Sequence, residues 1–128
     1  MKKLVTLFLL ILIPIIGVCN TVYYQSNEFA FKVVGGYWSD WEESSVLISI
    51  DTDRDLIIIH TAQPQRYKII EYMGEGEDNK GGYQIRFKVI DQDGDIGIVR
   101  IRRQANGVAQ LYIEYSDIMW VYSKLVVI

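Results

Sequence analysis

The sequence YQIRFKV, at residues 83–89, alternates between apolar and polar side chains without a break. Successive side chains of a β-strand point to opposite faces, so this alternation predicts a strand with one buried face. The apolar face would consist of Tyr83, Ile85, Phe87 and Val89. Helical periodicity is hard to find anywhere after residue 27, so we predict an all-β domain.

Seven further stretches alternate in the same way or form short apolar runs, and we predict strands at 28–34, 44–51, 56–61, 66–73, 96–103, 109–116 and 119–127. The segments between them carry turn residues, such as Asn106-Gly107, which tolerate positive φ and indicate hairpins. Short turns between successive strands imply antiparallel neighbours. We therefore predict a seven- to eight-stranded antiparallel meander that forms a small barrel, with a β-sandwich as the alternative. The barrel is favoured because closure removes the exposed edges of so apolar a sheet.

Residues 1–19 have the order of an export signal. Lys2 and Lys3 precede an apolar run at residues 4–16, and small or medium residues follow as far as Cys19. We favour cleavage just after Cys19. The alternatives are a lipoprotein signal, in which Cys19 becomes the acylated first residue, and an uncleaved anchor, for which the run is short. The predicted organisation is a signal peptide at residues 1–19, a linker at 20–27 and a single β domain at 28–128.

Composition and charge restrict the location and the partners. The leader predicts an exported protein of the periplasm or cell surface, or a secreted one, whose membrane contact is limited to the leader or a lipid anchor. Cys19 is the one cysteine, so the β domain forms no internal disulfide. Loss of Lys2 and Lys3 changes the net charge from −3 to −5. A negative domain repels phosphate backbones, so we expect no nucleic-acid partner.

Two predicted turns, at residues 51–55 and 91–95, spell D-x-D-x-D. Alternate carboxylates on a tight loop can converge on calcium. Neither loop has the glycine of an EF-hand at its sixth position, where Leu56 and Ile96 stand, or the glutamate at its twelfth. We interpret both as polar hairpin turns at opposite ends of the meander and expect no metal or cofactor. The weak calcium candidates are Asp51, Asp53, Asp55, Asp91, Asp93 and Asp95.

No catalytic motif stands out. His60 is the one histidine, so a second imidazole or a thiolate is not at hand to complete a metal site. No serine or cysteine pattern matches a nucleophile elbow or a catalytic dyad. A hydrolase-type activity would need a cleft that gathers His60 or paired carboxylates with tyrosine and arginine. We therefore expect a protein that is not an enzyme.

Aromatic residues give the strongest indication of a binding surface. Trp38 and Trp41 lie three residues apart beside Tyr37, and Trp120 and Tyr122 share one face of the last predicted strand. Such rings stack on sugars or anchor protein partners. These five are the candidate binding residues. The structural alternative is that one tryptophan fills the end of the barrel and the other covers a loop.

Gly36-Tyr37-Trp38 resembles the G-x-W motif on the first strand of lipocalin-like (calycin) barrels. The resemblance implies that Trp38 closes one end of the barrel and packs near a basic residue of the last strand, for which Lys124 is the candidate. It also implies a carrier of a small apolar ligand. The strand face predicted to line its cavity consists of Tyr83, Ile85, Phe87, Val89, Leu111 and Ile113.

A second resemblance concerns residues 65–67, Gly82, residues 89–94 and a run from Gln110 to Tyr122. This pattern is similar to a group of small, uncharacterised exported bacterial proteins and covers about half of the chain after the leader. It implies an exported β domain and no particular chemistry.

The function that these features favour is a non-enzymatic exported binding or interaction domain of the cell envelope. Its partner would be a protein or a glycan, and an inhibitor or immunity-type protein is the more specific version. The alternative is the lipocalin-like carrier.

Overall fold

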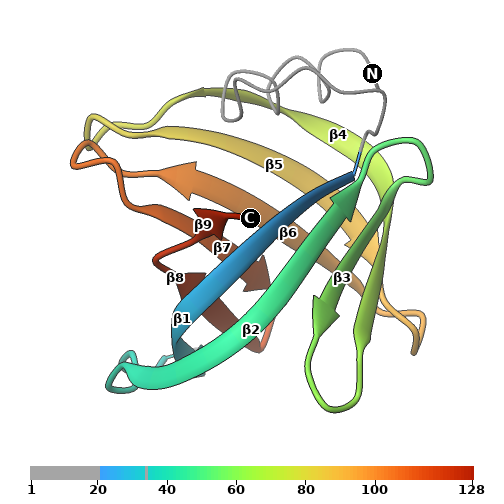
Figure 1. Cartoon of the computed structure of the whole chain (residues 1–128), viewed down its shortest axis with the longest axis horizontal. Coiled ribbons are helices and arrows are strands. Elements are labelled where there is room, and N and C mark those ends of the chain that lie inside the picture. Colours follow the sequence, from blue (N-terminus) through green and yellow to red (C-terminus); the bar gives the residue numbers. More distant parts are fainter. Residues whose placement is uncertain (1–20, 34) are drawn as a thin grey trace.

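The computed structural model describes residues 21–33 and 35–128, which form nine β-strands and no helix (Figure 1). The predicted signal peptide and the lipidation candidate Cys19 lie outside the described residues. The strands are β1 (Thr21–Val33), β2 (Glu42–Asp51), β3 (Leu56–His60), β4 (Gln65–Glu77), β5 (Tyr83–Ile90), β6 (Ile96–Arg103), β7 (Ala109–Glu114), β8 (Ile118–Ser123) and β9 (Val126–Val127).

Strands β2 to β8 follow one another as an antiparallel meander, and β1 pairs with both β2 and β8. These pairings close an eight-stranded antiparallel barrel, so the prediction of an all-β barrel is confirmed and the sandwich alternative is wrong. The extra strand β9 pairs with the first half of β1, where Val127 lies opposite Tyr24. Figure 1 shows β9 at the C-terminal end of the chain, just after β8.

The apolar residues of the alternating pattern fill the interior of the barrel. Ile85, Phe87 and Val89 of β5 are fully buried, and Gly97, Val99 and Ile101 face the same side from β6. Phe87 lies opposite Val99. Directly opposed side chains of an antiparallel pair lie close together, so apolar pairs of this kind stabilise the closed sheet.

The linker predicted at residues 20–27 is wrong for residues 21–27, which form the first half of β1. Tyr24 and Ser26 are buried there, and Tyr24 lies opposite Ile48 of β2. The polar composition concealed this strand, because alternate residues still point into the barrel. The strand predicted at 119–127 is instead divided at Lys124, whose φ of 55° turns the chain between β8 and β9.

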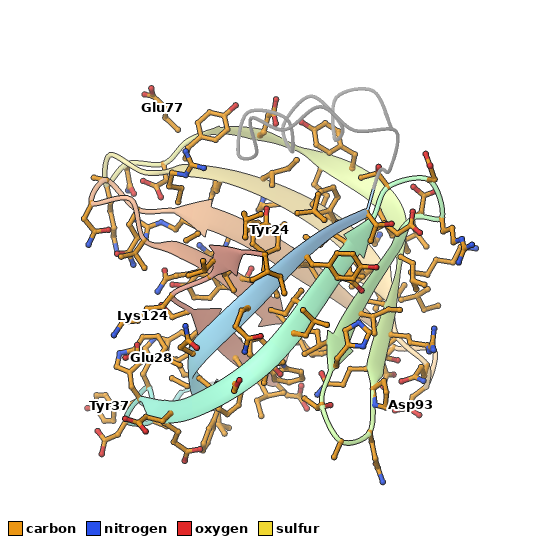
Figure 2. The ribbon with its side chains drawn as sticks, in the orientation of Figure 1. Tyr24, Glu28, Tyr37, Glu77, Asp93 and Lys124 are labelled. Atoms are coloured by element: carbon orange, nitrogen blue, oxygen red, sulfur yellow. The ribbon has the colours of Figure 1, made fainter. Side chains whose placement is uncertain are left out.

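The up-and-down topology gives the barrel two different ends. The aromatic end carries the loops at residues 35–41, 61–64, 91–95 and 115–117, whereas the arginine end carries the loops at 52–55, 78–82 and 104–108. Figure 2 shows Tyr37 and Asp93 toward the lower edge of the view and Glu77 at the upper edge. The two D-x-D-x-D turns lie at opposite ends, as the meander predicts.

Candidate binding site at the aromatic end

The mouth of the barrel at the aromatic end is a cavity of about 380 Å³. Three turns surround it, those between β3 and β4, between β5 and β6, and between β7 and β8. The lining residues are Gln65, Arg66, Tyr67, Asp91, Gln92, Asp93, Asp95, Tyr115, Asp117, Ile118 and Trp120. Barrel mouths that combine aromatic walls with a few polar groups are typical places for ligand sites.

Tyrosine hydroxyls join the walls of the mouth. The hydroxyl of Tyr115 donates a hydrogen bond of 2.6 Å to Oδ2 of Asp91, and the hydroxyl of Tyr67 donates one of 2.7 Å to Oε1 of Gln65. The Tyr115 ring also packs at 5.7 Å against Trp120. Burial raises the pKa of both phenols, and the Tyr115 hydroxyl lowers the pKa of Asp91. These groups form a preorganised floor in which the phenols stay protonated at neutral pH.

Asp91, Asp93 and Asp95 each place a carboxylate oxygen within 4.8 Å of the others. Oδ1 of Asp91 accepts the backbone N–H groups of Asp93 and Asp95, both at 2.9 Å. Both oxygens of Asp91 are therefore used to hold the turn and Tyr115. Asp93 and Asp95 are exposed and form no ion pair with another described residue. The turn thus presents negative charge at the rim of the cavity.

The other aspartate turn is organised in the same way. Oδ1 of Asp51 accepts the N–H groups of Asp53 and Arg54 at 3.0 and 3.1 Å. Within the described residues, Asp51, Asp53 and Asp55 do not bring their carboxylate oxygens together as the first group does. The backbone hydrogen bonds explain why both sequences contain aspartate at the first position of the turn.

An exposed apolar rim continues the cavity wall on β1. Phe31 and Val33 are 41% and 54% exposed. In the register of β1 and β8 they lie opposite Trp120 and Ile118, two of the residues that line the cavity. Opposed side chains on one face are near neighbours. The rim and the cavity therefore form one continuous surface. The sequence did not predict it, because alternation shows which side chains point inward but not which of them lie beyond the closed part of the barrel.

The five predicted binding residues do not form one platform. Trp120 lines the mouth, whereas Tyr122 is buried and packs 5.3 Å from Phe29. Tyr37 is almost fully exposed, and Trp41 is 49% exposed. Only Trp120 of the five contributes to the cavity.

Trp38 lies on the outer surface of the sheet. Its ring is 6.2 Å from that of Tyr112, over which the Arg100 guanidinium lies at 4.0 Å. The register places Val121 between Tyr112 and Ala30, and both small residues are only 2% exposed although they face outward. We infer that the indole of Trp38 crosses Ala30 and Val121 to reach Tyr112. The alternative in which Trp38 fills the end of the barrel is therefore wrong.

The resemblance to lipocalin-like barrels implied that Trp38 packs near Lys124, and the structure does not bring these two residues together. Gly36-Tyr37-Trp38 lies in the loop after β1 and not on a strand. The ammonium group of Lys124 lies 2.8 Å from Glu28, and Figure 2 shows these two residues side by side. The carrier hypothesis gains no support from its predicted cavity face, since Ile85, Phe87, Val89, Leu111 and Ile113 are packed in the core with the half-buried Tyr83 beside them.

His60 is exposed at the end of β3, where its Nε2 lies 3.0 Å from the hydroxyl of Ser49.

No protein-family model, curated protein or solved structure matches the chain. The described residues contain no helix with the length and apolar character needed to cross a membrane.

Proposed function

We propose that this protein is an exported, non-enzymatic binding domain of the cell envelope that engages a partner protein at the aromatic end. The observation that carries the proposal is the continuity between the cavity and the exposed side chains of Phe31 and Val33. Contiguous exposed apolar surface next to a concave site is typical of interaction surfaces. The aromatic floor would receive a partner side chain, and the rim would exclude water around it.

The charge around the mouth favours a basic partner. Four carboxylates line it, from Asp91, Asp93, Asp95 and Asp117, against the single guanidinium of Arg66. Exposed charges of this kind steer association with a surface of opposite sign. An inhibitor or immunity-type protein that masks a basic target is the specific version that fits. A neutral glycan, the other partner class that the aromatic residues favour, would not be steered by this negative rim.

The proposal is tested by native mass spectrometry of tagged protein purified gently from its own envelope. The mouth variant combines Phe31→Ala with Val33→Ala. The matched control combines Ile70→Ala with Val126→Ala, two exposed apolar residues away from the mouth. We expect a partner protein to be retained by the wild type and the control and lost from the mouth variant, with unchanged circular dichroism spectra. Equal retention by the mouth variant, or a bare chain in every case, contradicts the proposal.

A second comparison tests the partner class. Asp93→Asn with Asp95→Asn removes two negative charges at the mouth, and Glu75→Gln with Glu77→Gln removes two from exposed positions near the arginine end. A basic partner should associate more slowly with the first variant and normally with the second, and the difference should shrink as salt is added. A retained glycan, or equal effects of the two variants, would show that the partner class is wrong.

A further inference from the structure

A second cavity, of about 210 Å³, opens at the arginine end. It lies where β9, and not β8, is the neighbour of the first half of β1. Leu125 and Val127 form one side of it, and the end of β6 and the following turn form the other. The complete lining is Tyr24, Ile101, Arg102, Arg103, Gly107, Ala109, Leu125 and Val127.

The Tyr24 side chain in this wall has an unsatisfied polar group. Tyr24 is only 3% exposed, and its buried hydroxyl has no hydrogen-bond partner among the described residues. Nearly all buried polar side-chain atoms in folded proteins have a partner, so an exception calls for a physical explanation. Solvent does not reach this oxygen in the free protein, so a bound molecule with an acceptor atom would supply the missing bond after a small shift of the Tyr24 side chain toward the cavity.

The two arginines of the lining differ in what they contact. Arg102 is held by an ion pair with Asp78, in which Nε and Oδ2 are 2.5 Å apart. Arg103 is exposed and forms no ion pair with a described residue. The alternation of β6 places Arg103 on the inward face with Ile101, and the register places it opposite Ala109. Its charge is also close enough to Tyr24 to lower the pKa of that phenol, which burial raises to about 12.

The remaining walls are apolar. Ile101, Ala109, Leu125 and Val127 supply hydrocarbon surface beside the two polar groups. The volume lies below the roughly 300–1,000 Å³ typical of sites for drug-sized ligands, so the ligand must be small. The guanidinium and the phenol in the lining both act as donors, and a carboxylate is a small group that accepts from both.

We propose that this cavity binds a small monocarboxylate with a short apolar chain. Arg103 pairs with the carboxylate, the Tyr24 hydroxyl donates a hydrogen bond to the same group, and the chain lies against Ile101, Ala109 and Leu125. The site is separate from the mouth at the aromatic end and does not depend on the function proposed for it.

The test uses hexanoate as the probe, followed by calorimetry and by thermal unfolding of the purified protein. The comparison ligands are 1-hexanol, which has the chain without the charge, and inorganic phosphate, which has charge without the chain. Hexanoate should bind and raise the melting temperature, and both comparison ligands should bind at least about tenfold more weakly.

Three variants separate the contributions. Arg103→Gln should weaken hexanoate binding at least about tenfold, because a charged hydrogen-bonded contact is lost. Lys80→Gln, which removes an exposed cation at the same end without touching the cavity, should leave it unchanged. Tyr24→Phe should weaken binding and raise the melting temperature of the free protein, since it removes an unsatisfied hydroxyl.

Several results would overturn the proposal. They are no hexanoate binding, equal binding of hexanol, or equal binding by Arg103→Gln. A melting temperature of ligand-free Tyr24→Phe below that of the ligand-free wild type would show that an ordered water already satisfies the hydroxyl, which then needs no ligand. The Phe31→Ala, Val33→Ala variant should retain hexanoate binding, so failure here and failure of the mouth proposal are distinguishable.

Discussion

The Nε atom of Arg102 lies 2.5 Å from Oδ2 of Asp78, so an ion pair joins β6 to the loop between β4 and β5. The other oxygen of Asp78 accepts the N–H groups of Lys80 and Gly82 at 2.9 and 2.8 Å. The Arg102 hydrogen bond and then these backbone donors lower the pKa of Asp78 from 3.8 to about 2. One carboxylate thereby closes the loop and orients a guanidinium.

This relationship predicts a stability difference that depends on pH. The pKa of Asp78 is lower in the folded protein than in the unfolded chain, so its contribution is present above about pH 4 and is lost as the pH falls toward 2. Asp78→Asn should therefore be less stable than the wild type at neutral pH, and the difference should close over that range. Urea unfolding at several pH values measures it. Glu77→Gln, at a neighbouring exposed carboxyl, is the control, and a difference that persists unchanged at pH 2 would contradict the assignment.

Gly82 is required by the space beside this ion pair. A Cβ atom there would lie 2.7 Å from the backbone oxygen of Arg103 and 3.0 Å from Oδ2 of Asp78. Gly82→Ala should lower the free energy of unfolding by about 1–3 kcal/mol, because the backbone oxygen has to move. Gly76→Ala is the matched control, since no atom lies within 4 Å of its Cβ position, and it should change stability by no more than about 0.5 kcal/mol. Chemical denaturation of the two variants compares them, and equal effects would show that the contact is unimportant.

The hydroxyl of Tyr115 joins two turns at the mouth through Asp91. Tyr115→Phe removes the donor, so the pKa of Asp91 should rise and the protein should lose about 1.5–3 kcal/mol, the range for a hydrogen bond to a charged group. Carboxyl NMR titration reads the pKa, and urea unfolding reads the stability. Tyr37→Phe, at an almost fully exposed ring, should change neither. An unshifted Asp91 in the Tyr115 variant would refute the coupling.

The architecture could be predicted from the sequence because it follows from the alternation itself. Phe87 and its neighbours on β5 are apolar at every second position, and the turns with Asn106-Gly107 or alternate aspartates are short enough to force antiparallel pairing. The first half of β1 escaped prediction since Tyr24 and Ser26 are polar residues at inward positions. The division at Lys124 escaped because a residue with φ of 55° need not be glycine.

The candidate site was predictable only in part. Trp120 could be named as a candidate from its residue type, whereas the roles proposed for Phe31 and Arg103 depend on closure of the barrel. Each occupies an inward-facing position of its strand, as a core residue does, but lies at an open end of the barrel. Which residues of a meander lie at an open end depends on the stagger of all eight strands, and local periodicity does not contain that information.

Of the two tryptophans in the loop at residues 35–41, we expect Trp38 to contribute to stability and Trp41 to lie on the surface without doing so. The ring of Trp38 packs 6.2 Å from that of Tyr112, whereas Trp41 makes no ring contact with a described residue. Their exposed fractions, 41% and 49%, are nearly equal, so exposure alone does not distinguish them. Trp38→Ala should cost about 1–2 kcal/mol through lost apolar burial and the lost ring pair, and Trp41→Ala no more than about 0.5 kcal/mol. Urea unfolding measures both, and a neutral Trp38→Ala would show that the indole does not cover the sheet in solution.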